Sequence, residues 1–355
     1  MKNYYGIVMA GGVGSRFWPA STTDFPKQFH DLLGNGRSLL QNTYERLTAI
    51  IPQDNIMVLT NERYTGLVRK QLPYLQDKRI VGEPAMRNTA PAILLAALKV
   101  QQENPDGIMV IAPSDHLIAN NTQFWDDLQT CLDACDREDI LMTMGILPDS
   151  PHTGYGYIEQ TPVPGTPISK VARFVEKPDA ATAQQYLDSG NFLWNAGIFI
   201  WKASAIVSAF AKAQPSMHQL FLQAGSVLNT SQEQAWLSAN YAKAEDISID
   251  YAILEKVDHV SVLPVDFGWN DLGAWSALYD QGAKDNNGNV ANDARTLLEN
   301  SSNNVIHTGP DHKVVAVGLE DYIVVVENGI VLIAPRDQDQ HIKQLKAAYQ
   351  DKFHG

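Results

Sequence analysis

Cysteine is scarce in this chain: Cys131 and Cys135 are the two thiols among 355 residues. They lie four residues apart on a segment expected to be helical (124–135), form no C-x-x-C motif, and have no further cysteines with which to complete a metal site. We therefore interpret both as core thiols of a protein that works in a reducing, cytoplasmic environment.

Long apolar runs and an excess of positive charge are also missing. No uninterrupted apolar run approaches the roughly 20 residues that span a bilayer. Because the chain enters its first expected strand almost at once, we expect no secretory signal. With 27 Lys and Arg against 40 Asp and Glu, the net charge of −13 argues against nucleic acid or an anionic membrane as the main partner. A small nucleotide is not excluded, since it senses only the local charge of its site.

Residues 6–21 are the most informative segment. An apolar run at 7–10 predicts a buried strand, and Gly11, Gly12 and Gly14 follow it in a tight turn. Such a loop exposes backbone N–H groups at the carboxyl edge of a sheet, where they suit phosphate oxygens. Arg16, and Lys27 eleven residues further on, supply the positive charge that a polyphosphate needs.

Two better-known glycine loops do not fit this segment. In the dinucleotide fingerprint G-x-G-x-x-G, Gly12 and Gly14 would place Phe17 at the third glycine position, and no Gly-Lys-Ser/Thr is present for a P-loop. A glycine loop alone is often a plain strand-to-loop turn. The added basic residues favour a phosphate site here.

The order of expected elements indicates an α/β fold. Short apolar strands are expected at 7–10, 56–60, 80–81 and 107–112, with a helix at 89–102, and this alternation predicts a mostly parallel sheet covered on both faces. Ligands of such sheets bind beyond the carboxyl ends of the strands. The glycine loop and Asp115 each follow a strand, so we expect both at that edge.

The composition changes near residue 284. Polar, turn-rich pieces at 285–304 precede β-branched runs, and Asn328-Gly329 between two such runs predicts a hairpin. A helix is expected at 341–353. We therefore divide the chain into a domain at 1–283 and a linker with a small β-rich unit at 284–355.

Several carboxylates are candidates for chemistry, each with a plain structural alternative. Asp115 could equally be a metal ligand or a helix cap. Asp271 could be a metal ligand or a turn residue. Glu83 could accept the adjacent N1–H and N2–H₂ donors of guanine, which the other bases lack, or could begin a helix. Adjacent Glu176 and Lys177 point to opposite sides of an expected strand and could be a solvated pair.

Seven ordered segments together resemble the sugar-nucleotide pyrophosphorylase family, in its mannose-1-phosphate guanylyltransferase branch. They are MAGGVGSRFWP at 9–19, PKQ at 26–28, EPAMRNTAP at 83–91, PSDH at 113–116, FVEKP at 174–178, WNAG at 194–197 and GWNDLG at 268–273. The segments span roughly the first three quarters of the chain, and seven in order are far more specific than any one.

The resemblance implies a Rossmann-like sheet of the glycosyltransferase-A type, mixed but mostly parallel and flanked by helices, with a small, partial β-helix-like C-terminal unit. It implies transfer of GMP from GTP to mannose 1-phosphate. Asp115 and Asp271 would bind Mg²⁺, and Arg16, Lys27 and Lys177 would be the catalytic cations. The nucleotide would meet Gly11, Gly12, Gly14, Arg16, Lys27, Glu83 and Asn88, and the sugar phosphate would meet Gly154, Glu176, Lys177, Asn195 and Asp250.

Two alternatives remain open. The chain could transfer another nucleotide, or act on another hexose or heptose phosphate, and it could instead be a regulatory protein that binds sugar nucleotides without catalysis. The two aspartates and the two basic residues expected in the site, Arg16 and Lys27, are all present. Their presence disfavours a regulatory protein without catalysis. Longer relatives carry a fused isomerase domain, for which we expect no room before Gly355. The sequence does not fix the oligomeric state and leaves a homodimer open.

Overall fold

The chain forms two compact units. A computed structural model describes residues 3–291, 295–309 and 311–353. The large unit comprises Met1–Gly11, Thr43–Pro113 and Ile118–Trp269. The small unit comprises Gly12–Asn42, Ser114–Leu117 and Asn270–Gly355. The C-terminal part therefore shares a compact unit with the glycine loop and the segment around Asp115.

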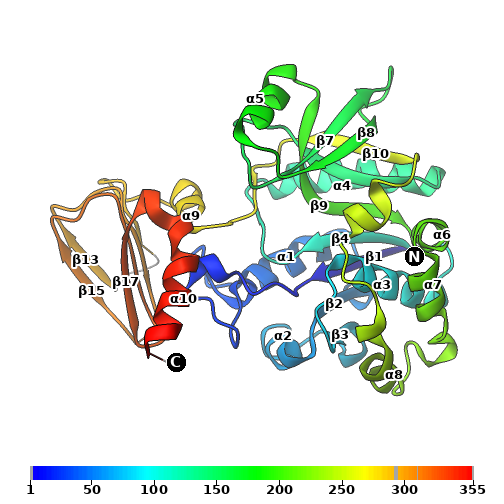
Figure 1. The fold of residues 1–355 in the computed structure, drawn as a ribbon, viewed down its shortest axis with the longest axis horizontal. Coiled ribbons are helices and arrows are strands. Elements are labelled where there is room, and N and C mark those ends of the chain that lie inside the picture. The colour runs from blue at the N-terminus through cyan, green and yellow to red at the C-terminus, as the bar shows by residue number, and fades with distance from the viewer. Residues whose placement is uncertain (1–2, 292–294, 310, 354–355) are drawn as a thin grey trace. The chain divides into compact units, whose positions relative to one another are not determined.

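A nine-stranded mixed sheet forms the centre of the large unit, in the order β3-β2-β1-β4-β9-β6-β10-β8-β7 (Figure 1). Seven of the nine strands run in one direction, and β8 and β9 run in the other. The strands are β1 (Tyr4–Met9), β2 (Ile56–Asn61), β3 (Ile80–Glu83), β4 (Ile108–Pro113), β6 (Leu141–Ile146), β7 (Gly156–Pro162), β8 (Ser169–Glu176), β9 (Phe192–Lys202) and β10 (Val260–Val265). The predicted fold class is confirmed.

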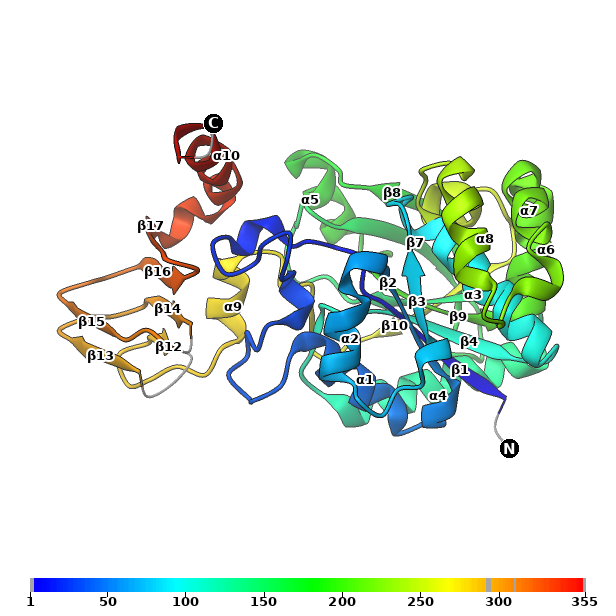
Figure 2. The same ribbon diagram turned by 90° about the horizontal axis from the view of Figure 1, so that it is seen from below.

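Helices cover both faces of this sheet. Figure 2 shows α1 and α4 on one face and α6, α7 and α8 on the other. The helices are α1 (Leu39–Thr48), α2 (Thr65–Gln71), α3 (Thr89–Glu103), α4 (Asn121–Arg137), α5 (Ala180–Ser189), α6 (Ala203–Ala213), α7 (Pro215–Leu222) and α8 (Glu233–Asn240). None of the helices in the described parts of the chain combines the length and the apolar character needed to cross a membrane.

The core explains why these segments fold as they do. Every residue of α3 from Ala90 to Val100 is buried, because the helix packs on the sheet with one side and against α6 with the other. On the opposite face, α4 buries Cys131 and Cys135, and the Cys135 thiol lies 3.3 Å from the carbonyl oxygen of Ile200 in β9. Both cysteines are free and buried, as expected.

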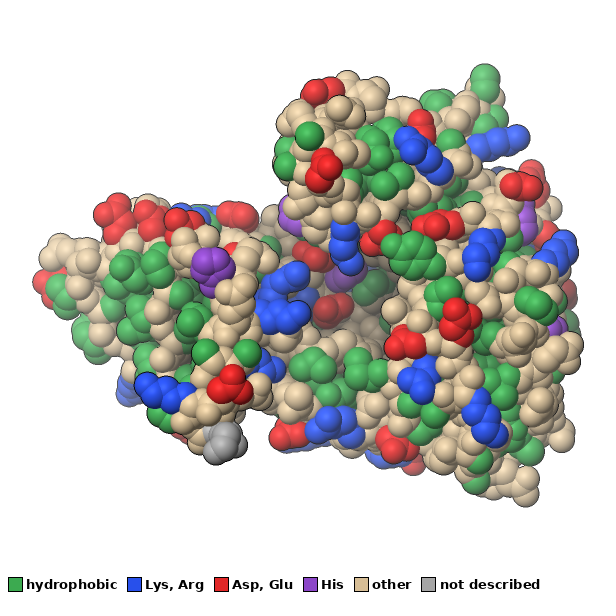
Figure 3. All heavy atoms as spheres, in the orientation of Figure 1, with side chains coloured by type: hydrophobic (Ala, Val, Ile, Leu, Met, Phe, Trp, Pro, Cys, Tyr) green, Lys and Arg blue, Asp and Glu red, His purple; other side chains and the backbone are tan. Residues whose placement is uncertain are grey.

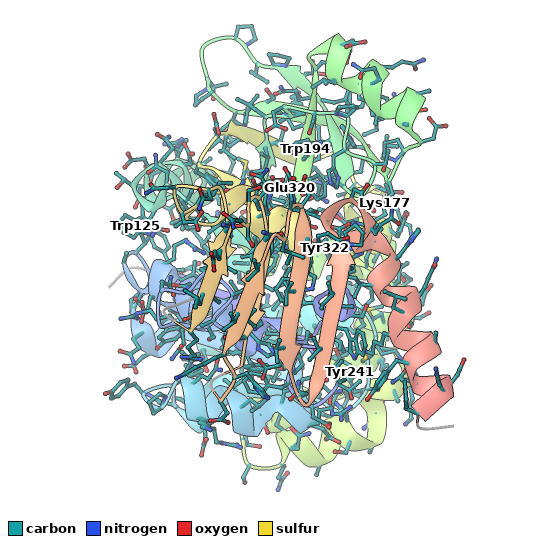
Figure 4. The ribbon with its side chains drawn as sticks, turned by 90° about the vertical axis from the view of Figure 1, so that its left-hand side faces the viewer. Trp125, Lys177, Trp194, Tyr241, Glu320 and Tyr322 are labelled. Carbon is teal, nitrogen blue, oxygen red and sulfur yellow. The ribbon has the colours of Figure 1, made fainter. Side chains whose placement is uncertain are left out.

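The small unit contains two stacked sheets built from its C-terminal part. The strands β12 (Val290–Ala291), β14 (Val305–Thr308), β16 (Tyr322–Glu327) and β17 (Ile330–Pro335) form one sheet, and β13 (Thr296–Glu299) and β15 (Val314–Val317) form the other. The chain alternates between them and pairs in parallel up to β16, as a partial β-helix does. Figure 4 shows these strands, with Tyr322 of β16 and the nearby Glu320 labelled.

Helices α9 (Trp275–Gln281) and α10 (Ile342–Phe353) also belong to the small unit. The chain passes from one unit to the other at two strands of two residues each, β5 (Leu117–Ile118) and β11 (Trp269–Asn270).

The predicted hairpin is confirmed: β16 and β17 pair antiparallel around Asn328 and Gly329, which both have positive φ, at 51° and 72°.

Apolar side chains also lie on the outside of the small unit. The exposed ones on β13, β15 and β17 are Leu297, Val315, Val317, Val331 and Ile333. Figure 3 shows hydrophobic side chains gathered on one face of this unit. Their inward neighbours, among them Ile306, Val314 and Val324, form the core between the two sheets.

Candidate active site

A polar pocket of about 330 Å³ lies within the small unit. Its lining comes from the glycine loop, from the segments after β4 and β11, and from α10. The lining residues are Gly14, Ser15, Arg16, Phe17, Lys27, Asp115, His116, Asp271, Gly273 and Lys343. Four residues predicted from separate sequence segments, Arg16, Lys27, Asp115 and Asp271, thus line one pocket.

The glycine loop is shaped to admit Lys27. Gly14 has φ +69°, and a Cβ at Gly14 would overlap the Cβ of Lys27, so glycine is required there for both conformation and space. The backbone N–H of Lys27 donates to the carbonyl oxygen of Val13 at 3.3 Å, and the Ser21 hydroxyl donates to the same oxygen. These bonds fix the loop against the segment that carries Lys27.

Lys27 joins the two aspartate segments. Its side chain is 4% exposed, and its Nζ donates to Asp115 Oδ2 at 3.0 Å and to the backbone oxygen of Asp271 at 2.7 Å. The ammonium also lies 5.5 Å from the centre of the Phe17 ring. A buried ammonium needs such partners, because an unpaired buried charge is very costly.

Asp115 is held in its charged form. Burial alone would raise its pKa, but the charges of Lys27 and His116 and the hydrogen bond from Lys27 outweigh burial, and the net pKa is lowered. The interpretation of Asp115 as a helix cap is wrong, because the chain after it forms strand β5 and α4 is capped by Asn120.

Asp271 combines a turn with a position in the pocket. Its Oδ1 accepts the N–H of Gly273 at 2.9 Å, so the turn interpretation is confirmed. Within the described ranges, no three His, Cys, Asp or Glu side chains gather where they could hold a metal by themselves. Two carboxylates that line one polar pocket fit a divalent cation such as Mg²⁺, which commonly takes one or two carboxylates plus substrate phosphate oxygens.

Lys343 is a pocket residue that sequence reasoning missed. It is the second residue of α10, for which only a tail helix was expected. His116, to which no role was assigned, lines the pocket as well. With Arg16 and Lys27, Lys343 gives three basic side chains against two aspartates, a balance that suits a polyanionic ligand.

Glu83 ends strand β3 in the large unit, and the residue is 8% exposed. The hydroxyl of Tyr241 donates to its Oε1, and a methyl group on Gly11 would lie 3.9 Å from its Oε2. Burial raises the pKa of Glu83 from 4.5 to about 7, while the bond from Tyr241 lowers it. Glu83 does not begin a helix: α3 begins at Thr89, whose N–H donates to Asn88 Oδ1 at 3.0 Å.

We expect Glu83→Gln to stabilise the protein increasingly as the pH rises. Because the pKa of Glu83 is higher in the folded state, its contribution to stability is complete below the unfolded value and is lost as the pH rises toward 7. The glutamine variant has no such loss. Its free energy of unfolding, relative to that of the wild type, should therefore increase by up to about 3 kcal/mol between about pH 5 and pH 8. Melting curves at both pH values test this. The exposed control Glu62→Gln should show no such trend.

A second polar cluster of the large unit contains Glu176, Asn195 and Asp250. Asn195 Nδ2 donates to Asp250 Oδ1 at 2.9 Å, and Asp250 begins a short π-helical turn (Asp250–Leu254), a distortion common at functional sites. Burial raises the pKa of Asp250, and the nearby charge of Glu176 raises it further. Gly156, to which the sequence assigned no role, leaves the space that Glu176 fills, since a Cβ there would lie 2.7 Å from Glu176 Oε1.

Aromatic rings lie around Gly154, near this cluster. The Gly154 N–H donates to His152 Nδ1 at 3.1 Å, and the His152 ring stacks on Tyr155 at 3.8 Å. The Tyr155 ring in turn meets Trp194 and Trp269, each at 5.1 Å; Trp194 is labelled in Figure 4. Their spacing along the chain gave no signal that they would meet.

Lys177 follows strand β8 directly. The strand ends at Glu176, and Lys177 adopts the left-handed conformation with φ 44°. The expectation that the two side chains point to opposite sides therefore does not apply. The Lys177 Nζ lies 3.7 Å from Glu176 Oε2, and the side chain is 67% exposed, as a solvated pair would be.

Known proteins are similar to this chain over most of its length. Residues 5–288 match the family described as "Nucleotidyl transferase". A mannose-1-phosphate guanylyltransferase of Klebsiella pneumoniae is 38% identical over 95% of this chain and 72% of its own length. The alginate biosynthesis protein AlgA of Pseudomonas aeruginosa is 36% identical over 96% of this chain and 70% of its own.

A solved structure from Thermus thermophilus, described as a "mannose-1-phosphate geranyltransferase", superposes with a TM-score of 0.87 at 29% identity, covering 98% of this chain and 100% of its own. The family match covers most of this chain, and the two curated relatives align with nearly all of it. The chain therefore belongs to the nucleotidyl transferase family, in its mannose-1-phosphate guanylyltransferase branch.

Proposed function

We propose that this protein transfers GMP from GTP to α-D-mannose 1-phosphate, giving GDP-mannose and pyrophosphate. The observation that carries the proposal is the small-unit pocket, in which the buried Lys27 ammonium bonds to both aspartate segments beside a glycine loop. The names of the relatives supply the substrates by likeness.

The reaction needs positioning and charge neutralisation, and no protein nucleophile. A phosphate oxygen of mannose 1-phosphate attacks the α-phosphorus of GTP in line with the departing pyrophosphate. Arg16 and Lys27 offset the negative charge that builds on the pyrophosphate. Lys177 offsets the negative charge of the attacking phosphate. Lys343, from the same pocket as Arg16, adds a further cation for the triphosphate.

Asp115 and Asp271 are proposed as the protein ligands of Mg²⁺. The lowered pKa of Asp115 keeps that carboxylate ionised and therefore able to bind a cation at neutral pH. When bound, a divalent cation supplies a template and a Lewis acid for the phosphates. Lys27 holds the two segments that carry these carboxylates and so fixes their spacing.

The remaining residues are assigned by substrate. Backbone N–H groups at Gly11, Gly12 and Gly14 would bind the triphosphate, and Glu83 the base. Asn88 is proposed for the nucleotide as well, although its side chain caps α3. Glu176, Asn195, Asp250 and the backbone of Gly154 would bind the hexose, where the carboxylates accept from its hydroxyls.

The proposal is tested by steady-state release of pyrophosphate with a panel of triphosphates and sugar phosphates. We expect the highest kcat/KM with GTP and mannose 1-phosphate. A higher value with another pair assigns the chain to another nucleotidyl transfer, and tight sugar-nucleotide binding without turnover assigns it to a regulatory protein. We also propose a cytoplasmic location, supported by the two buried free thiols.

Glu176→Gln and Asn195→Ala should impair use of mannose 1-phosphate while GTP binding stays nearly intact. An unpaired polar group typically costs roughly 1–3 kcal/mol, which corresponds to about a ten- to hundredfold rise in the sugar-phosphate KM. Calorimetry with GTP·Mg²⁺, and then with mannose 1-phosphate and a non-reactive GTP analogue, checks this. Lost nucleotide affinity with intact sugar-phosphate affinity would show that the two binding roles are reversed.

A further inference from the structure

Tyr241 is a buried residue to which the proposed reaction gives no role. It begins a short 3-10 helix (Tyr241–Lys243) directly after α8, and its side chain is fully buried. Its ring meets the Phe221 ring edge-on at 5.8 Å. The next residue, Ala242, is held through its carbonyl oxygen, which accepts from Arg87 Nε at 3.1 Å and Arg87 Nη2 at 2.7 Å. Tyr241, labelled in Figure 4, is thus fixed by ring packing and by its backbone.

The Tyr241 hydroxyl bonds to the Glu83 carboxylate on one oxygen. That bond goes to Oε1, while Oε2 lies on the side of Gly11, where a methyl group would approach it to 3.9 Å. A carboxylate oxygen has two lone pairs, so Oε1 can accept a second hydrogen bond from a ligand. A single donor from a fixed ring therefore holds one oxygen of the carboxylate in place and leaves acceptor capacity on both oxygens.

We propose that Tyr241 is a positioning residue for guanine selectivity: it orients Glu83 so that both oxygens accept from the base, one from N1–H and the other from N2–H₂. This inference rests on the proposed function, in which Glu83 reads the base. Orientation matters here because two parallel hydrogen bonds from one base edge require the carboxylate to lie in the plane of the base.

Tyr241 and Glu83 shift each other's pKa in the direction that this role needs. Burial and the charge of Glu83 raise the pKa of Tyr241 well above its usual value, while Arg87 acts in the opposite direction, so the phenol stays a donor at neutral pH. Burial raises the pKa of Glu83, and the bond from Tyr241 opposes that effect. The phenol therefore helps to keep Glu83 ionised, which is the form that accepts two hydrogen bonds.

Tyr241→Phe tests the proposal, because it removes the hydroxyl and keeps the ring. GTP and inosine triphosphate are compared as substrates, since hypoxanthine keeps N1–H and lacks the 2-amino group. We expect the GTP-to-ITP ratio of kcat/KM to fall by about three- to tenfold, the usual effect of one hydrogen bond, through the KM for GTP. The KM for mannose 1-phosphate should not change, and the pH below which GTP binding weakens should rise.

Tyr5→Phe is the matched control, because Tyr5 is also a buried phenol of the large unit but lies near the opposite end of β1 from Gly11. Arg87→Ala, which removes both hydrogen bonds to the carbonyl oxygen of Ala242, should lower the same ratio by a smaller factor. An unchanged ratio in Tyr241→Phe with a lower melting temperature would overturn the proposal and leave Tyr241 a packing residue. If Glu83→Gln also leaves the ratio unchanged, the assignment of Glu83 to the base fails instead.

Discussion

Alanine at Asp115 or at Asp271 should remove most of the transferase activity, with kcat/KM falling by at least about a hundredfold in each variant. Each change is expected to deprive the metal of a protein ligand. The Asp115 carboxylate is also the partner of the buried Lys27 ammonium, and the backbone oxygen of Asp271 is another acceptor for the same group. Because the two residues act as one unit, the double variant should be little worse than either single variant.

A chelation experiment and a control variant at a nearby aspartate complete this test. EDTA should abolish pyrophosphate release and added Mg²⁺ should restore it, and the conservative variant Asp115→Asn should need more Mg²⁺ than the wild type. Asp266→Ala is the control, because Asp266 lies five residues before Asp271 in the chain and is exposed. Full activity in chelator, or equal losses in all three aspartate variants, would contradict the metal assignment.

The sequence predicted the scaffold because the relevant signals are local. Continuous apolar runs mark β1 and β4 as buried strands, and polar or glycine residues follow each run directly. The carboxyl ends of these strands are ligand-binding positions in any such sheet, so Gly11 and Asp115 could be singled out without a structure. The Asn328-Gly329 hairpin was predictable for the same reason, since two positive φ values favour that pair of residues.

Residues that sequence reasoning missed depend on contacts between distant segments. Tyr241 meets Glu83 across 158 positions of the chain. Lys343 joins the pocket because a tail helix packs beside the glycine loop, and its own neighbours in the sequence carry no phosphate motif. Gly156 matters only because the Glu176 carboxylate occupies the space where its Cβ would be. None of these contacts has a local signature.

The division into compact units could not be predicted from neighbouring residues either. The composition changes near residue 284, and a domain boundary between residues 283 and 284 stays a prediction. The compact units instead join 12–42 and 114–117 to 270–355. The reason is the core of the small unit, in which Phe17 and Leu32 pack with Trp275 and Ile323. Shared apolar packing, which composition along the chain cannot show, determines the grouping.

Lys27→Met should lower kcat by about thirty- to a thousandfold while calorimetric affinity for mannose 1-phosphate stays near that of the wild type. Methionine keeps most of the length of the buried side chain and removes its charge, so the loss falls on the step in which charge builds on pyrophosphate. One charge-assisted contact in such a site commonly supplies on the order of 2–4 kcal/mol of transition-state stabilisation. Arg16→Ala should have a smaller effect in the same direction, because Arg16 is exposed and its charge is screened by water.

The matched control is Lys99→Met. Lys99 is as deeply buried as Lys27 and is ion-paired with Glu233, but it lies on α3 in the large unit and does not line the small-unit pocket. Both variants should lose stability, since each leaves a carboxylate without its partner. The folded fraction of each variant is measured by circular dichroism and active-fraction titration. When kcat is calculated per folded molecule, only Lys27→Met should show a loss. A near-normal kcat/KM in Lys27→Met would show that this lysine neither offsets charge on the pyrophosphate nor is needed to hold Asp115 and Asp271 in place, and equal losses in both variants would trace the effect to folding.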